Sequence, residues 1–135
     1  MREIKFRGKS EEFDGWMHGD LSLLNEDNEP MIYTDALSEW LVIPETVGQF
    51  TGLKDKNGRE IYEGDILQIN IYSWNWKDKI IATGKAAVEY RGCTFGVEWG
   101  FSRDFTGLDT FSQNCTFEVI GNVHDNPELL GVALE

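Results

Sequence analysis

The sequence predicts a mainly β protein whose C-terminal part forms a small barrel or a sandwich. Aromatic residues make up 13% of the 135 residues, and 14 glycines accompany only 3 prolines, a composition typical of strands joined by tight turns. Apolar and polar residues alternate in several short stretches, as they do in strands with one buried face. Between residues 65 and 123 these stretches follow one another at the close spacing of small all-β domains.

The N-terminal region is predicted to begin with a hairpin. Residues 3–7 alternate, with Ile4 and Phe6 apolar and their neighbours charged, which indicates a half-buried strand. Residues 13–17 supply its antiparallel partner after a short turn. Residues 25–30 are polar and rich in turn formers, so we expect them to form an exposed loop.

Residues 35–42 admit two interpretations. Asp35 could cap a short helix, one face of which would carry the apolar residues Leu37, Trp40 and Leu41. The same residues could instead enter a strand that runs to Ile43. We favour a short helical turn followed by a strand.

The centre of the chain carries the clearest turn signal. Asn57 and Gly58 predict a hairpin with a type I′ turn, because both residues tolerate the positive φ that this turn requires. Gly64 and Asp65 predict a second turn, which leads the chain into a strand over residues 66–71.

The rest of the chain is predicted to consist of short strands and one helical turn. Strand-like runs, divided by glycines, cover residues 80–83, 85–90 and 94–99. A last strand over residues 115–123 precedes the helical turn. In that turn Asn126 is the expected N-cap and Pro127 the first helical residue.

The charge balance excludes several classes of protein. The chain holds 24 acidic and 12 basic residues, a net charge of -12, so it cannot coat nucleic acid or adsorb to an anionic membrane by bulk electrostatics. Two cysteines are too few for a disulfide scaffold, and no apolar run has the length of a membrane-spanning helix. We therefore expect a cytoplasmic protein with reduced thiols that binds no membrane.

Lys54, Lys56 and Arg59 form the first candidate site, a basic hairpin tip that could contact an acidic partner. The alternative is that the hairpin needs Asn57 and Gly58 for its backbone conformation and that the charged side chains only solvate it. We favour this alternative, because turn chemistry explains the central residues directly.

Catalytic and metal-binding candidates are weaker. Asp65 lies near Glu63, but no second acid or base at a defined spacing supports acid–base catalysis, so we expect Asp65 to accept backbone hydrogen bonds in its own turn. A metal site usually contains a closely spaced pair of ligands, and no such pair exists among Cys93, Cys115, His18 and His124. We expect no enzymatic activity, no cofactor and no metal.

An aromatic-rich connection contains Tyr72, Trp74 and Trp76. Exposed aromatic residues in a loop can grip a peptide or stack on bases. They can equally fill the core of a small β domain, where large side chains are needed. The sequence leaves both interpretations open, and this segment is the best candidate for a partner surface.

Three pieces of the chain resemble the YopX family of small phage and prophage proteins. They are REIKFR at residues 2–7, QFTGLKDKNGREIYEGDI at residues 49–66 and FEVIGNVHDNPELL at residues 117–130. The resemblance implies an SH3-type barrel in the C-terminal part, after a more variable N-terminal region. We accordingly expect a β-rich region over residues 1–48 packed on a barrel over residues 49–135. The resemblance supplies no catalytic residues.

The expected function is that of a phage or prophage accessory protein that works as a non-catalytic protein-interaction module in the cytoplasm of a bacterial host. Its partner would be an unidentified host or phage protein. One alternative is an acidic inhibitor that imitates DNA. Another is a nucleic-acid-binding SH3-like module, which would need a local basic strip made of Lys54, Lys56, Arg59, Lys77, Lys79 and Lys85. Pairing of copies through exposed edge strands is also open.

Overall fold

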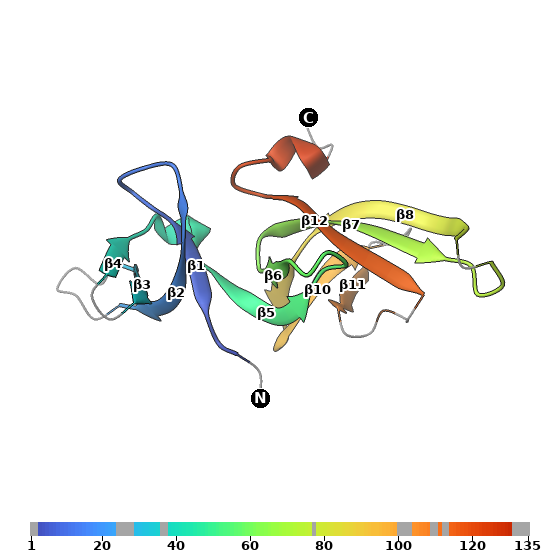
Figure 1. Cartoon of the computed structure of the whole chain (residues 1–135), viewed down its shortest axis with the longest axis horizontal. Helices are drawn as coiled ribbons and strands as arrows, with labels where there is room; N and C mark the ends of the chain where they lie inside the picture. The colour runs from blue at the N-terminus through green and yellow to red at the C-terminus, as the bar shows by residue number, and fades with distance from the viewer. Residues whose placement is uncertain are drawn as a thin grey trace. The chain divides into compact units, whose positions relative to one another are not determined.

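A computed structural model describes residues 3–23, 29–35, 38–76, 78–99, 104–108, 111 and 114–130. The described residues are mainly β, as the sequence predicts, and their helical parts are short 3₁₀ turns. The chain divides into two compact units, Met1–Gly52 and Leu53–Glu135 (Figure 1). No helix among the described residues has the length and apolar character needed to cross a membrane.

The first unit is built on antiparallel strands. They follow the spatial order β4-β3-β2-β1-β5, and the strands are β1 (Phe6–Lys9), β2 (Trp16–Ser22), β3 (Met31–Asp35), β4 (Ser38–Leu41) and β5 (Gly48–Lys54). β1 pairs with β2 from Phe6↔Gly19 to Lys9↔Trp16, which confirms an N-terminal hairpin, although each strand begins three residues later than predicted. Ile32 and Val42 are fully buried in this unit. The loop expected at residues 25–30 falls largely on residues 24–28, which lie outside the described residues.

The helical turn that we favoured after Asp35 is wrong. Asp35 is the last residue of β3 and pairs with Ser38 of β4, and Trp40 lies opposite Ile32. Cross-strand pairing of apolar side chains therefore outweighs the weak helical pattern of this stretch. Residues 36–37 lie outside the described residues. The helical turn comes later, at η1 (Pro44–Thr46), where proline occupies the first turn.

The second unit contains the longer strands. Its sheets have the orders β12-β7-β8 and β11-β10-β9, whereas β6 continues the sheet that ends in β5. The elements are β6 (Glu60–Tyr62), β7 (Asp65–Tyr72), β8 (Ile80–Ala87), β9 (Glu89–Arg91), β10 (Thr94–Trp99), β11 (Asp104–Gly107), β12 (Cys115–Asn122) and η3 (Pro127–Leu130).

The closed SH3-type barrel expected for the C-terminal part is not what the described residues form. Each of the two three-stranded sheets keeps two edge strands, so both sheets are open. The reason lies in the pairing of the strands. β7 bonds to both of its neighbours along nearly all of its length, while the short strands β9–β11 pair only with one another.

The core of the second unit is formed by residues of both sheets. Leu67 and Ile69 of β7 and Val97 of β10 are fully buried in it. Gly84 lies inside β8 and does not divide two strands, contrary to the predicted break between residues 83 and 85. A Cβ atom at this position would come within 2.8 Å of the Trp99 ring, so the packing of that ring requires a glycine.

Two local features of the second unit follow from turn chemistry. Gly92 and Cys93 both have positive φ, 56° and 66°, in the two-residue connection between Arg91 and Thr94, which is the geometry of a type I′ turn. η3 begins at Pro127 as predicted, and the Asn126 carbonyl accepts from Leu129 N. The Asn126 side chain accepts a hydrogen bond from Asn122 N instead of capping the helix.

Candidate functional site

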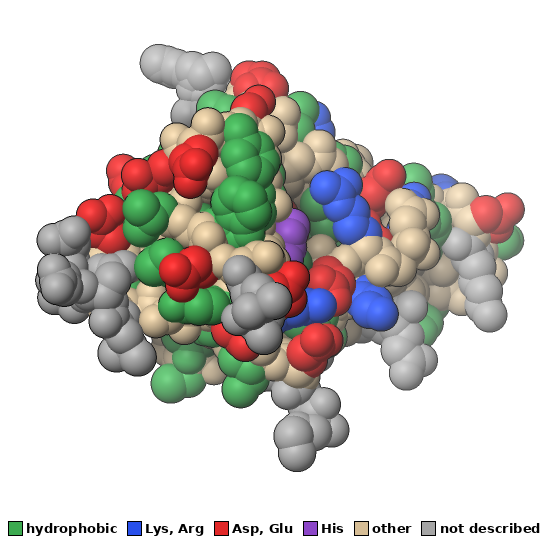
Figure 2. All heavy atoms as spheres, turned by 60° about the vertical axis from the view of Figure 1, so that its left-hand side comes forward, with side chains coloured by type: hydrophobic (Ala, Val, Ile, Leu, Met, Phe, Trp, Pro, Cys, Tyr) green, Lys and Arg blue, Asp and Glu red, His purple; other side chains and the backbone are tan. Residues whose placement is uncertain are grey.

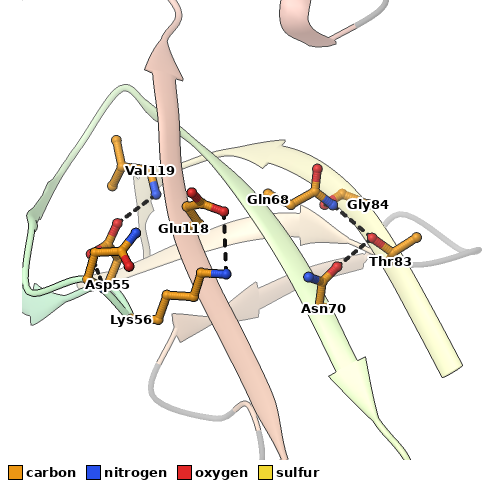
Figure 3. Close-up of polar contacts among 9 residues, drawn as sticks. Asp55, Lys56, Gln68, Asn70, Thr83, Gly84, Glu118 and Val119 are labelled. Carbon is orange, nitrogen blue, oxygen red and sulfur yellow. Dashed lines mark hydrogen bonds and ion pairs between the residues drawn. The ribbon is translucent and has the colours of Figure 1, made fainter. Parts of the chain in front are cut away.

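The hairpin that joins β5 to β6, residues 54–60, is organised around the carboxylate of Asp55. One oxygen, Oδ1, accepts hydrogen bonds from the backbone N–H groups of Asn57 and Arg59, both at 2.9 Å. The other, Oδ2, accepts from Val119 N of β12 at 2.9 Å (Figure 3). Asp55 is 8% exposed. One buried side chain thus holds the turn together and fastens it to a strand 64 residues away in sequence.

The turn in this hairpin differs from the predicted type. Gly58 has a positive φ of 84°, but Asn57 does not share it. Gly58 N bonds to the Asp55 carbonyl at 3.0 Å, and Asp55 N bonds to the Arg59 carbonyl at 2.8 Å. The hairpin is therefore confirmed, whereas type I′ is wrong, because the Asp55 side chain stabilises a tight turn followed by a single left-handed glycine.

The environment of Asp55 favours its ionised form. Burial raises the pKa of the carboxyl group, but hydrogen bonds from Val119, Arg59 and Asn57 and the charge of Arg59 act in the opposite direction. The net effect lowers the pKa below its ordinary value. The negative charge is therefore part of the fold and is not an exposed group that awaits a ligand.

The basic residues of the hairpin lie on its surface. Lys54, Lys56 and Arg59 are exposed. Lys56 Nζ lies 3.6 Å from Glu118 Oε1 of β12 (Figure 3). Lys56 N bonds to the Phe117 carbonyl. An ion pair as exposed as this one contributes little to stability. The hairpin therefore exposes basic side chains, while the conformation of its backbone is explained by its own hydrogen bonds.

Asp65 has the structural use that the sequence predicts. Its Oδ2 accepts a hydrogen bond from Tyr62 N at 2.7 Å, and its carbonyl accepts from Val88 N. The residue is 2% exposed, so substrate cannot reach the carboxylate. This turn joins β6 to β7, and its Gly64 carbonyl also accepts from Val123 N. The catalytic interpretation of Asp65 gains no support from this geometry.

The connection between β7 and β8 has the opposite character. We use the name β7–β8 tip for the described residues 72–76 and 78–81. Trp74 is 71% exposed and Trp76 is 65% exposed, while Tyr72 is half-buried at the end of β7. The connection between these strands lies at the far end of the β7–β8 ribbon (Figure 1). Of the two interpretations left open by the sequence, core filling is therefore wrong for these two residues.

The β7–β8 tip is ordered by its own hydrogen bonds. Ser73 Oγ accepts from Asn75 N at 3.2 Å and from Trp76 N at 3.3 Å. Ser73 N bonds to the Lys79 carbonyl, and Lys79 N bonds to the Trp76 carbonyl, both at 2.9 Å. The Lys79 ammonium lies 5.4 Å from the centre of the Trp76 ring, within the range of a cation–π contact. The aromatic side chains are thus displayed on a defined loop.

Sequence reasoning did not identify two exposed apolar residues of the β7–β8 tip. Ile80 is 47% exposed and Ile81 is 58% exposed at the start of β8. The pairing of β7 with β8 shifts there, because Ile71 faces Ala82 and Tyr72 faces Ile80, so Ile81 is the extra residue of a bulge. A signal was present, since consecutive isoleucines beside a lysine do not alternate as a half-buried strand should.

The structure does not join the two groups of predicted site residues into one site. The hairpin at residues 54–60 is bonded to Phe117 and Val119 of β12, near the point where Glu118 faces Gln68 of β7. Trp74 lies six residues further along the chain from Gln68, which corresponds to about 20 Å of extended strand. Lys77 of the postulated basic strip lies outside the described residues.

The thiols and imidazoles form no recognisable centre. Cys93 is exposed in its turn, and Cys115 is half-buried, where burial raises the pKa of its thiol. Within the described part of the chain, no three side chains of His, Cys, Asp or Glu come together in a way that could hold a metal ion.

The acidic side chains are interspersed with others. Figure 2 shows, on one face, acidic groups in separate places between hydrophobic and basic ones. Several acids are engaged in ion pairs on the surface. These include Glu89 and Glu98, which share the Arg91 guanidinium at 2.6 and 2.8 Å. On this face, such a patchwork counts against imitation of the regular phosphates of DNA.

The chain matches known proteins over nearly its whole length. The family model described as YopX protein matches residues 5–131. Among solved structures, protein yopX from Bacillus subtilis is 24% identical, with a TM-score of 0.59, and the match covers 96% of this chain and 99% of that one. Protein EF1440 from Enterococcus faecalis is 23% identical, with a TM-score of 0.57 and the same coverage. No curated protein matches. These two structures are similar to this chain in fold.

Proposed function

The chain belongs to the YopX family, and we propose that it acts by binding another protein through the β7–β8 tip, without chemistry of its own. The single observation behind this proposal is the exposure of Trp74 and Trp76, at 71% and 65%, on a loop that is internally hydrogen-bonded. Large aromatic side chains left in water at the end of a ribbon add nothing to the core of their own domain.

Tryptophan is the kind of residue that dominates binding energy in protein interfaces. A Trp side chain offers about 150–250 Å² of contact area, and hot spots are enriched in this residue. Ile80 and Ile81 extend the apolar surface, and Lys79 supplies a charged rim. Because Ser73 already fixes the loop, less conformational entropy is lost when a partner binds.

We place this activity in the cytoplasm of a bacterial host, where the protein would be an accessory factor of a phage or prophage. The family resemblance supports this setting. Asp65, the carboxylate that the sequence offered as a catalytic candidate, is buried and bonded to Tyr62 N, and this structural use favours a role without catalysis.

An affinity capture from host lysate with quantitative mass spectrometry tests the proposal. The baits are the wild-type chain, the double variant W74A/W76A and the control I4S/L23S. The control removes two other exposed apolar side chains, at 65% and 51% exposure, from the first unit. We expect a specific partner to be captured by the wild type and the control and lost from W74A/W76A by at least tenfold. Equal capture by all three baits would reject the β7–β8 tip as the binding surface.

A further inference from the structure

We infer that the partner binds as an extended acidic segment, which adds a strand to the free edge of β8 while its side chains contact the tryptophans of the β7–β8 tip. This inference rests on the proposed function, since it uses the same end of the molecule. It specifies the chemistry of the partner and the way in which its backbone is held.

The first step is the position of β8. It is the outer strand of the sheet β12-β7-β8, and among the described residues only β7 pairs with it. Ile80, Ile81, Ala82 and Thr83 are all exposed, so the outer half of the strand is uncovered. An edge strand of this kind presents backbone N–H and C=O groups to any chain that can lie beside it.

The second step identifies the backbone groups on the free edge. Val88 N bonds to the Asp65 carbonyl of β7, and hydrogen-bonded pairs alternate along an antiparallel ladder. Counting back from Val88 in steps of two residues leads to Gly84, so the backbone groups of Gly84 also point towards β7. The Gly84 carbonyl accepts a hydrogen bond from Gln68 Nε2 of that strand at 3.1 Å. Thr83 and Lys85 therefore direct their backbone groups outwards, where a partner strand can pair with them.

The third step concerns charge. Residues 66–88 contain three lysines and one aspartate, a net charge of +2, whereas the rest of the chain has 23 acids and 9 bases, a net charge of -14. Lys79 and Lys85 stand at either end of the uncovered stretch. Opposite charges on neighbouring strands stabilise their pairing, and like charges oppose it. This ribbon is therefore suited to an acidic segment.

The same charges disfavour a second copy of this chain as the occupant. Pairing two β8 edges would bring together six lysines and only two aspartates from residues 66–88 of both copies. A single-stranded nucleic acid could stack on the tryptophans, but its backbone has no N–H groups that could pair with the edge of β8. Both occupants are outcomes of the experiment described below.

The test uses peptides selected on the full-length chain from a displayed library of random 12-residue segments. The decisive variant is T83P, which removes the outward N–H of Thr83; proline is tolerated where a strand faces solvent. The Thr83 hydroxyl accepts from Gln68 Nε2 at 2.8 Å and donates to Asn70 Oδ1 at 2.6 Å (Figure 3). T83A loses these side-chain bonds but keeps the N–H, so it is the matched control.

We expect the selected peptides to be acidic and rich in β-branched residues. Their affinity should fall at least tenfold for T83P and less than threefold for T83A. Amide hydrogen exchange of the wild-type chain should show new protection at Thr83 and Lys85 when a selected peptide is bound, which keeps the inference testable if T83P fails to fold. Equal binding by T83P and T83A, neutral or basic selected peptides, or no selected peptides at all would overturn it.

Further measurements separate the other occupants and the two proposals. A fluorescent 20-residue oligothymidine that binds the chain and competes with the peptides would overturn the acidic segment in favour of nucleic acid. A wild-type dimer in light scattering that T83P makes monomeric would overturn it in favour of a second copy. If W74A/W76A loses the peptides and T83P keeps them, strand addition fails and the proposed function stands. If both variants keep the peptides, both proposals fail.

Discussion

The hairpin at residues 54–60 and the β7–β8 tip are both turns of the second unit, and both drew attention in the sequence. In the hairpin, the Asp55 carboxylate accepts three backbone hydrogen bonds and is 8% exposed. In the β7–β8 tip, Trp74 and Trp76 point into water at 71% and 65% exposure. The hairpin thus uses its distinctive residue to stabilise the fold, while the tip leaves its distinctive residues exposed to solvent. The two regions should respond in opposite ways to substitution.

The largest effect is expected for D55A. This substitution leaves the N–H groups of Asn57, Arg59 and Val119 without their acceptor, and bonds to a charged group contribute about 1.5–3 kcal/mol each. We expect the free energy of unfolding to fall by at least about 3 kcal/mol, measured by urea denaturation. K56A, which removes only the exposed ion pair with Glu118, should cost less than about 0.5 kcal/mol. Equal losses for the two variants would contradict the assigned role of Asp55.

The pH dependence of stability should differ between the wild type and D55N. The pKa of Asp55 is lowered in the folded chain, so its charge stabilises the fold above the unfolded-state pKa, near the ordinary value of 3.8. This contribution is lost as the pH falls through the lower, folded-state pKa. The difference in unfolding free energy between the two proteins should therefore be constant near neutral pH and shrink in acid. A difference that does not change with pH would show that the charge has no such effect.

A smaller loss is expected for G58A in the same hairpin. Gly58 has a φ of 84°, and no atom lies within 4 Å of a Cβ built there, so any cost comes from backbone conformation alone. We expect a loss of about 1–2 kcal/mol in urea denaturation. G58N is the matched control and should lose clearly less, because asparagine tolerates this conformation. Similar losses for both variants would argue against a conformational cause.

The smallest effect on stability is expected for W74A/W76A. Exposed side chains outside the core change the free energy of unfolding by less than about 0.5 kcal/mol. W99A is the contrast, because Trp99 packs against the core and its ring contacts Phe111, with ring centres 6.0 Å apart. Its loss should be about 3 kcal/mol or more. A large destabilisation by W74A/W76A would mean that the β7–β8 tip supports the fold.

Turn signals and alternation predicted much of the architecture. The N-terminal hairpin, the hairpin at residues 54–60, the strand after Asp65 and the turn at Pro127 are all observed. Two of the errors share one physical cause, which is that strand pairing and side-chain packing outweigh the conformational preferences of a short stretch of residues. Asp35 continues a strand because β4 pairs beside it, and Gly84 stays within a strand because the Trp99 ring packs on it.

The candidate surface was predictable only in part. The sequence singled out Trp74 and Trp76 but could not decide between core and surface, because aromatic residues suit both. Ile80 and Ile81 were assigned to a strand, and their exposure depends on the lack of a neighbour for β8, which is a property of the assembled sheet. The free edge itself has no sequence signal of its own.

The sequence by itself determined the β class, the main turns and the family resemblance, because these depend on residue types that neighbour one another in the chain. Tertiary structure alone decided that the sheets stay open, that Asp55 reaches Val119, and that β8 ends as an uncovered strand beside two exposed tryptophans. The physical reason is that burial and strand pairing are set by segments far apart in sequence. Residue 55 meets residue 119 only when β12 is in place.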